Sequence, residues 1–138
     1  MKNRRQRLGS WGEDLAADFL QKQGFEILAR NLRTPHGEID LVARMKACDI
    51  SEPVRQNAQA LLTVFVEVKA RSGTEFGYPE QAVTAAKRLH LLAAAQEYIL
   101  QHPETGGEWR VDVIAILRPR DGSAPQIRVF ENAITAEG

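Results

Sequence analysis

Apolar residues run almost without interruption through the middle of the chain, from Leu61 to Lys69. Phe65 points to one side of this segment and the neighbouring valines point to the other, the pattern of a central strand covered on both faces. Glu67 and Lys69 lie at its C-terminal end and share one face, about 6.5 Å apart, because strand side chains alternate with a period of two. A buried strand has little room for unpaired charge. This end of the strand is therefore the first candidate for a functional site.

A second strand with charged residues is predicted upstream, over Gly37–Ala43. Its alternation puts Glu38 and Asp40 on one face. Ile39 and Leu41 fall on the opposite face. Together the two strands offer carboxylates and one lysine.

Helices are predicted on both sides of these strands. The first begins at Ser10, because Ser10 and Glu13 have the spacing of a capping box, and it ends near Gly24. The second follows Thr84 as its N-cap and continues to about Leu100. One face of the second helix is predicted to carry Leu89, Leu92, Ala93, Gln96, Ile99 and Leu100.

The order of the elements predicts a single domain, residues 1–138, of the α/β class. The remaining predicted strands are Phe25–Leu32, Trp109–Leu117 and a short edge strand at Ile127–Phe130. A turn at residues 34–37 makes the first two strands an antiparallel hairpin, and the second helix implies a right-handed parallel crossover. We expect a mixed sheet of about five strands flanked by helices. Residues 1–8 are expected to form a basic tail, and residues 44–60 a long loop or insertion.

Composition limits the location and chemistry of the chain. Eighteen basic residues balance eighteen acidic ones, so the net charge does not itself call for a polyanionic partner. The single cysteine, Cys48, excludes an internal disulfide and a cysteine-built metal site. No apolar run approaches the roughly 20 residues that cross a bilayer, and no signal segment follows the basic N-terminus. We therefore expect a cytoplasmic protein without membrane contact.

Carboxylates on two neighbouring strands, with a lysine beside them, suit a hard divalent cation. Mg²⁺ prefers oxygen ligands and commonly uses one or two carboxylates together with substrate phosphate. Without a cation, close carboxylates repel each other and one tends to take a proton. A cation polarises the phosphoryl oxygen, while a lysine can orient the attacking water or offset developing charge. Asp40, Glu67 and Lys69 therefore predict Mg²⁺-dependent phosphate chemistry, with Mn²⁺ as a substitute ion.

Several of these residues also have a structural interpretation. Glu13 either folds back on the Ser10 amide as a cap or points toward the sheet and the other carboxylates. Glu67 and Lys69 could form only a buried ion pair.

Basic residues and Asp112 likewise keep two interpretations. Arg71, Lys87 and Arg88 either contact phosphate or belong to a solvated surface. Asp112 either binds metal or pairs with Arg110 or Arg71. The three histidines are scattered, and we expect surface or packing roles for His36, His90 and His102.

Asp40, followed after a gap by Glu67-Val68-Lys69, resembles the signature of the PD-(D/E)xK, or restriction-endonuclease-like, nuclease superfamily. The finer resemblance is to the bacterial YraN-type endonuclease family, which is similar to archaeal Holliday-junction resolvases. It extends from about Leu8 to Phe130. The motifs that carry it are Gly12-Glu13, Arg30-Asn31 with Arg33, Gly37–Ala43, Phe65–Lys69 with Arg71, Lys87 and Arg110-Val111-Asp112. The chain departs from the pattern in having Ile39 before Asp40, where the superfamily signature has proline, and in its longer segment at 44–60.

The resemblance implies a restriction-endonuclease-like core and a metal-dependent deoxyribonuclease, with branched or junction DNA as a candidate substrate. It implies Asp40, Glu67 and the backbone carbonyl of Val68 as metal ligands. Lys69 would lie at the attacking water, and Glu13 would be an additional carboxylate at the metal shell. The candidate nucleic-acid contacts are Arg33, Arg71, Lys87 and Arg88. A resolvase-like enzyme needs two active sites, so a two-fold homodimer is expected on this interpretation.

A second interpretation is a nucleic-acid-binding or adaptor protein that keeps the nuclease fold without cutting. The neutral net charge and the long segment at residues 44–60 suggest it. Salt-sensitive DNA binding with no turnover in Mg²⁺ or Mn²⁺ would distinguish it from a nuclease.

Overall fold

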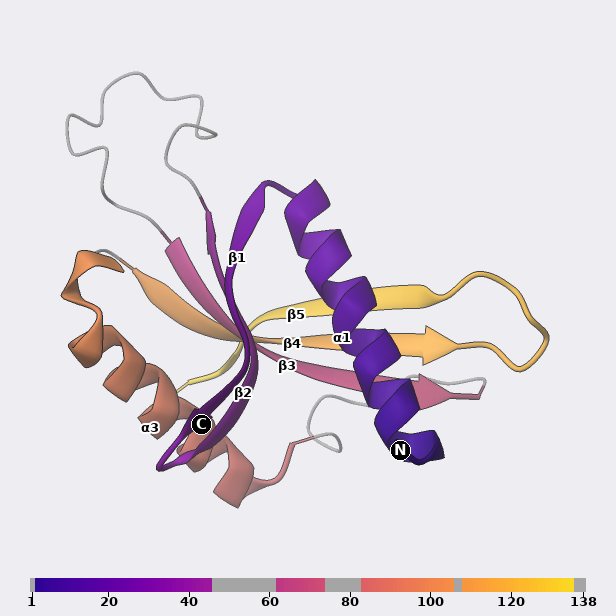
Figure 1. Ribbon diagram of the computed structural model, residues 1–138, viewed down its shortest axis with the longest axis horizontal. Helices are drawn as coiled ribbons and strands as arrows, with labels where there is room; N and C mark the ends of the chain where they lie inside the picture. Colours follow the sequence, from indigo (N-terminus) through magenta and orange to yellow (C-terminus); the bar gives the residue numbers. More distant parts are fainter. Residues whose placement is uncertain (1, 46–61, 74–82, 106–107, 136–138) are drawn as a thin grey trace.

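In this computed structural model, a twisted sheet is flanked by helices (Figure 1). The structure describes residues 2–45, 62–73, 83–105 and 108–135. The elements are, in order, α1 (Arg4–Lys22), β1 (Phe25–Thr34), β2 (Gly37–Met45), β3 (Leu62–Ser72), α3 (Ala85–Gln101), the 3-10 helix η2 (Pro103–Thr105), β4 (Trp109–Arg118) and β5 (Gln126–Ile134). Most of the predicted loop at 44–60 lies outside the described residues, although 44 and 45 belong to β2.

The sheet has the strand order β1-β2-β3-β4-β5. β3 and β4 run parallel, and the other neighbouring pairs are antiparallel. The predicted mixed α/β sheet of five strands is confirmed, and so is the β1–β2 hairpin. The parallel pairing of β3 with β4, the two strands that α3 connects, is confirmed as well. β2 pairs with β3 only from Leu62 to Val66, so from Glu67 onward β3 pairs with β4 alone.

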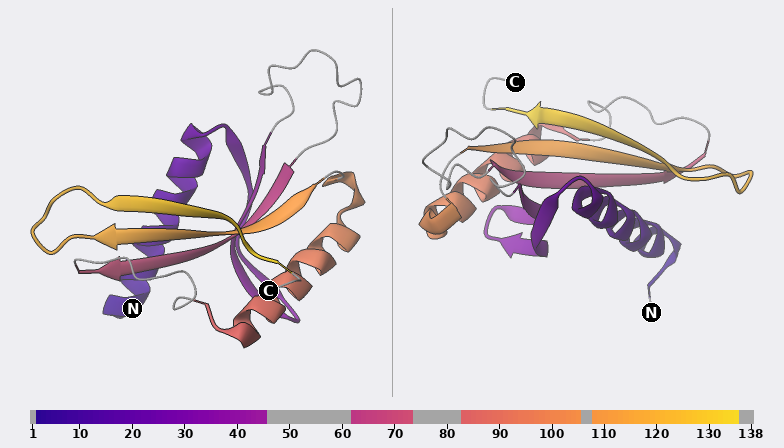
Figure 2. Two further views of the ribbon diagram at one scale, coloured as in Figure 1. Left: turned by 180° about the vertical axis from the view of Figure 1, so that it is seen from behind. Right: turned by 90° about the horizontal axis from the view of Figure 1, so that it is seen from above.

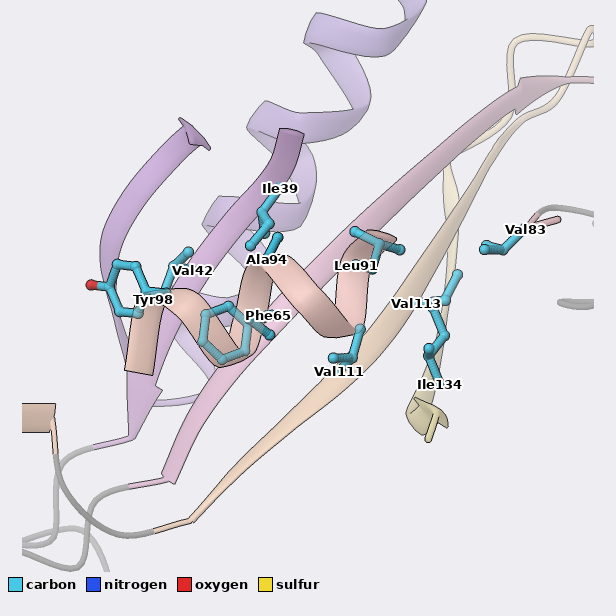
Figure 3. Packing of buried hydrophobic residues seen from close by; sticks show 11 residues of the cluster. Ile39, Val42, Phe65, Val83, Leu91, Ala94, Tyr98, Val111, Val113 and Ile134 are labelled. Carbon is cyan, nitrogen blue, oxygen red and sulfur yellow. The ribbon is translucent and has the colours of Figure 1, made fainter. Parts of the chain in front are cut away.

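Helices α1 and α3 lie against the sheet (Figure 2), and two apolar clusters fill the contacts between them and the strands. One joins α1, through Ala16 and Leu20, to the β3 valines at 64, 66 and 68. The other joins α3 to Phe65, whose ring makes an edge-to-face contact with Tyr98 at a centroid distance of 5.5 Å (Figure 3). Phe65 makes a second edge-to-face contact with Trp109 at 5.9 Å. The predicted division of β3 into a valine face and a Phe65 face is confirmed.

The alternation of β2 is interrupted at Asp40, contrary to prediction. Ile39 packs in the α3 cluster, whereas Leu41, two residues later, packs in the α1 cluster. A regular pleat would place both on one face. Asp40 therefore lies at the point where the alternating side chains of β2 switch between the α3 cluster and the α1 cluster.

α1 begins six residues earlier than predicted, so part of the expected basic tail is helical. Asn3 is its N-cap, and it forms a capping box with Gln6 through hydrogen bonds of 2.8 and 3.0 Å. Ser10 lies inside the helix, where its hydroxyl accepts a 2.6 Å hydrogen bond from Lys2 Nζ. Glu13 is therefore free of the capping role. The helix ends at Lys22, close to the predicted stop at Gly24.

α3 follows its predicted N-cap, because the Thr84 side chain accepts a hydrogen bond from the Lys87 amide. The predicted apolar face is confirmed only in part: Leu92 and Ile99 pack against the cluster on α3. Leu89 and Leu100 were predicted wrongly, because they are 69% and 81% exposed. The residues buried against the sheet are instead Leu91, Ala94, Ala95 and Tyr98. β5 is also longer than the short edge strand expected, spanning nine residues.

Candidate functional site

Asp40 lies where β2 and β3 stop pairing. The ladder between these strands ends at Leu41 opposite Val66. Beyond it, Asp40 Oδ2 accepts a 2.8 Å hydrogen bond from the Val68 amide. A carboxylate thus occupies the place of the next backbone acceptor, and the interior of the sheet gains a polar opening at this point.

Glu67 is buried beside this opening. Its side chain is 2% exposed, and its Oε1 lies 3.3 Å from Lys69 Nζ and 3.1 Å from Lys87 Nζ. Its Oε2 is buried and has no hydrogen-bond partner among the described residues. Buried carboxylate oxygens are rarely left in this state, so Oε2 is an acceptor open to a ligand.

Burial and the nearby Glu67 carboxylate both disfavour a negative charge on Asp40. Burial and, second to it, the negative charge of Glu67 raise the pKa of Asp40 from 3.8 to about 7. The Val68 amide and, more weakly, the Lys87 ammonium oppose this rise in pKa. In the free protein, a proton or a cation is therefore favoured at Asp40 near neutral pH.

Lys87 reaches the site from the first turn of α3. Burial disfavours its charge, but the carboxylate of Glu67 outweighs burial and raises the Lys87 pKa above its usual value. The sequence suggested Lys87 as a phosphate contact and did not predict its ion pair with Glu67. Only the packing of α3 against the sheet brings these two residues together.

Glu13 approaches the same carboxylates from α1. Burial raises the pKa of Glu13, while a hydrogen bond from the Asn31 side chain and the charge of Arg30 oppose the rise. Its negative charge also contributes to the raised pKa of Asp40. Gly12 makes this approach close, because a Cβ at that position would lie 2.6 Å from the Cβ of Ala70.

Asn31 is a site residue to which the sequence analysis gave no role of its own. Its backbone φ is +51°, a left-handed conformation that asparagine adopts more readily than most residues. From β1 its side chain reaches Glu13. An asparagine within a predicted strand was the available signal, since asparagine is depleted in strands.

The other predicted contact residues lie farther out. Arg33 and Arg71 are exposed on β1 and β3, and Arg88 is half-buried on α3. Asp112 is buried and pairs with Arg110 Nε at 3.0 Å, while accepting a hydrogen bond from the Asn132 amide. Of its two predicted interpretations, the ion pair is therefore the one observed.

The donor set fits a cation held by two carboxylates better than one held by three. Within the described ranges, no group of three or more His, Cys, Asp or Glu side chains is placed to hold a metal ion. Asp40 and Glu67 instead offer a carboxylate of raised pKa and an unpartnered buried oxygen. Mg²⁺ commonly binds with one or two carboxylates and fills its other positions with water and phosphate.

The chain matches one protein family over most of its length. The profile described as "Uncharacterised protein family UPF0102" matches residues 12–116. This chain belongs to the UPF0102 family. A UPF0102 protein of Syntrophotalea carbinolica is 41% identical over 138 residues, covering 100% of this chain and 99% of the relative. A UPF0102 protein of Syntrophomonas wolfei is 44% identical over 110 residues, covering 80% and 84% of the two chains.

Membership of UPF0102 confirms the YraN-type part of the resemblance, whereas the PD-(D/E)xK nuclease superfamily stays a prediction. The α/β sheet is consistent with a restriction-endonuclease-like core. The matched region contains Glu13, Asp40, Glu67 and Lys69. Among the described residues of this UPF0102 chain, no helix has the length and apolar character of a membrane span.

Proposed function

We propose that this UPF0102 chain is a Mg²⁺-dependent endonuclease that hydrolyses phosphodiester bonds in DNA, with branched or junction DNA as a candidate substrate. One observation carries the proposal. On adjacent strands, the half-buried carboxylate of Asp40 has a pKa raised to about 7, and the buried carboxylate of Glu67 has an oxygen without a hydrogen-bond partner among the described residues. A divalent cation bound between them would stabilise the ionised form of Asp40 and would give the unpartnered Glu67 oxygen a ligand bond.

Asp40, Glu67 and the carbonyl of Val68 are the ligands this proposal assigns. The Val68 amide points to Asp40, and the amide and carbonyl of a strand residue face the same neighbouring strand. The Val68 carbonyl therefore faces the same opening. Glu13 is assigned to the water shell of the ion, because it acts on Asp40 through charge. When bound, Mg²⁺ would polarise the phosphoryl oxygen and lower the pKa of a bound water.

The lysines supply positive charge on either side of Glu67. Lys69 is 32% exposed, so its ammonium can contact both Glu67 and solvent, as a group that orients the attacking water must. Lys87 holds the Glu67 carboxylate from the helix side at 3.1 Å. Since an ammonium has three donors, each lysine retains capacity to contact phosphate oxygens.

A second candidate function, nucleic-acid binding without cleavage, is favoured by the same ion pairs. Both ammonium groups contact Glu67 Oε1, so much of the Glu67 charge is balanced without a cation. In that case Glu67 would maintain the fold, and the basic surface around it would bind a partner.

Cleavage of end-labelled DNA tests the proposal. Single-stranded, duplex, flap and four-way-junction substrates are incubated with the protein in Mg²⁺, in Mn²⁺ and in EDTA. We expect metal-dependent cutting that falls by roughly 10²-fold or more in Asp40→Asn and in Lys69→Ala. Asp18→Asn is the matched control, because Asp18 is exposed on α1 and pairs only with Lys22 among the described residues.

Retained cutting by both site variants would contradict the proposal. Salt-sensitive binding of the same DNA by wild-type protein, without cutting in either metal, would support the second function instead.

A further inference from the structure

A cavity of about 200 Å³ lies next to the carboxylate site, lined by the β1–β2 turn and the N-terminal half of α3. The ribbon views show this turn beside α3 (Figures 1 and 2). Its described lining residues are His36, Gly37, Glu38, Lys87, His90 and Leu91. Lys87 lines the cavity and also belongs to the carboxylate site, because its ammonium lies 3.1 Å from Glu67 Oε1. Glu38 precedes Asp40 by two residues, or about 6.5 Å along β2. A group in this cavity would therefore be adjacent to a phosphate held at Asp40 and Glu67.

The turn that forms one wall is held by its own hydrogen bonds. The Thr34 hydroxyl donates to the Gly37 carbonyl at 2.7 Å and accepts from the His36 amide at 3.1 Å. On the α3 side, His36 Nε2 lies 3.4 Å from Glu97 Oε2, a contact that becomes an ion pair when the imidazole is protonated. These contacts fix the wall before any ligand arrives, which lowers the ordering cost of binding.

The chemistry of the lining favours a nucleobase over a phosphate. Leu91 gives the cavity a buried apolar side, and the Glu38 carboxylate would repel an anion. A base instead offers a flat face to an imidazole and amino or imino protons to a carboxylate. The volume is below the roughly 300–1,000 Å³ of pockets for drug-sized ligands, so it suits one ring system.

We infer that this cavity, formed by His36, Glu38, Lys87 and His90, captures one unpaired nucleobase beside the phosphate that is cleaved. The inference rests on the proposed function and narrows its substrate class. A carboxylate such as Glu38 accepts from the amino and imino groups of a base edge that pairing occupies in a duplex. The substrate must therefore have an unpaired nucleotide next to the cleaved bond, as single strands, flaps and junction centres do.

Fluorescence of 2-aminopurine tests base capture without turnover. The probe is placed at successive positions in a single strand, in a flap and in a duplex, each mixed with the full-length Asp40→Asn protein. We expect a fluorescence change at one or two adjacent positions in the single strand and the flap, and none in the duplex. An RNA strand of the same sequence shows whether the captured base must come from DNA.

Two further substitutions, each made in the Asp40→Asn protein, connect the signal to the cavity. His90→Ala removes one stacked ring, and Glu38→Gln replaces one acceptor oxygen with an amide donor and removes the charge. Each is expected to weaken single-strand binding about tenfold, with duplex binding unchanged. Gln96→Ala, an exposed position on the same helix, is the matched control for the first. Glu104→Gln, an exposed carboxylate in η2, is the control for the second.

The inference is overturned if no probe position responds, or if both cavity variants weaken duplex and single-strand binding equally. The cleavage assay separates this inference from the proposed function. Metal-dependent cutting without a probe response would keep the nuclease and reject base capture. A probe response without cutting by the wild-type protein would keep base capture and reject the nuclease.

Discussion

At the level of single residues, Asp40 makes the stability of the metal-free protein depend on pH. Its folded-state pKa is raised from 3.8 to about 7. A group of this kind contributes its full stability below pH 4 and loses it as pH rises through 7, because the folded state binds the proton more tightly than the unfolded state.

Asp40→Asn should therefore be more stable than wild type at pH 8 in EDTA, by roughly 2–4 kcal/mol in the free energy of unfolding. Asparagine keeps an oxygen for the Val68 amide but carries no charge. Urea denaturation at pH 4 and pH 8 measures the difference, which should nearly vanish at pH 4. Asp18→Asn should show no such pH-dependent gain. An equal difference between wild type and Asp40→Asn at both pH values would contradict the assignment.

Lys87 should control the same titration from across the site. Its positive charge lowers the pKa of Asp40, so Lys87→Met should move that pKa above 7. Carboxyl carbon NMR can follow the titration directly. Unfolding at pH 8 should become easier by about 1 kcal/mol, the scale of a partly exposed ion pair. Lys22→Met removes the exposed pair with Asp18 and should leave the Asp40 pKa where it is. An unchanged Asp40 pKa in Lys87→Met would show that Lys87 does not act on the site.

Among the elements, the close packing of α1 on β3 determines how Glu13 meets the strand carboxylates. Gly12→Ala places a methyl group 2.6 Å from Ala70 Cβ, so the helix must shift away from the strand. We expect a loss of about 1–3 kcal/mol in the free energy of unfolding, the usual cost of overpacking.

Gly9→Ala provides the contrast within the same helix. A Cβ at Gly9 meets nothing within 4 Å, so the substitution should stabilise the protein by about 0.5–1 kcal/mol through helix propensity. Thermal and urea denaturation of the two variants measure both effects. Equal stabilisation by both substitutions would mean that the helix does not depend on the contact at Gly12.

The elements also differ in how far sequence could predict them. β3 was predictable because apolar residues on both of its faces leave few alternatives to a central strand. The start of α1 was not, since Asn3 and Ser10 are both good caps and the arginines between them are good helix formers. The buried face of α3 includes the small residues Ala94 and Ala95, which add little to a hydrophobic pattern.

For the molecule as a whole, the sequence indicated that Asp40 and Glu67 lie on neighbouring strands. It did not indicate that Lys87, on α3, contacts Glu67. Asp40 and Glu67 lie on the neighbouring strands β2 and β3, but Asp40 enters the site where the ladder ends and the alternation of β2 is interrupted, which the sequence pattern did not predict. Lys87 meets Glu67 only because α3 crosses the sheet at a particular angle and depth, which residue spacing along the chain does not determine. Lys87, which was predicted as a phosphate contact, thus forms an ion pair with Glu67 in the folded protein.

Titration calorimetry of Mn²⁺ into the metal-free protein at pH 7.5 tests the central claim most directly. We predict saturable binding to wild type and to Asp18→Asn, with affinity for Asp40→Asn lower by tenfold or more. Proton release on binding should be larger in buffers near pH 7 than at pH 8.5, because Asp40 must lose its proton to the ion. Equal Mn²⁺ affinity in wild type and Asp40→Asn, or no binding to either, would contradict a cation site at Asp40 and Glu67.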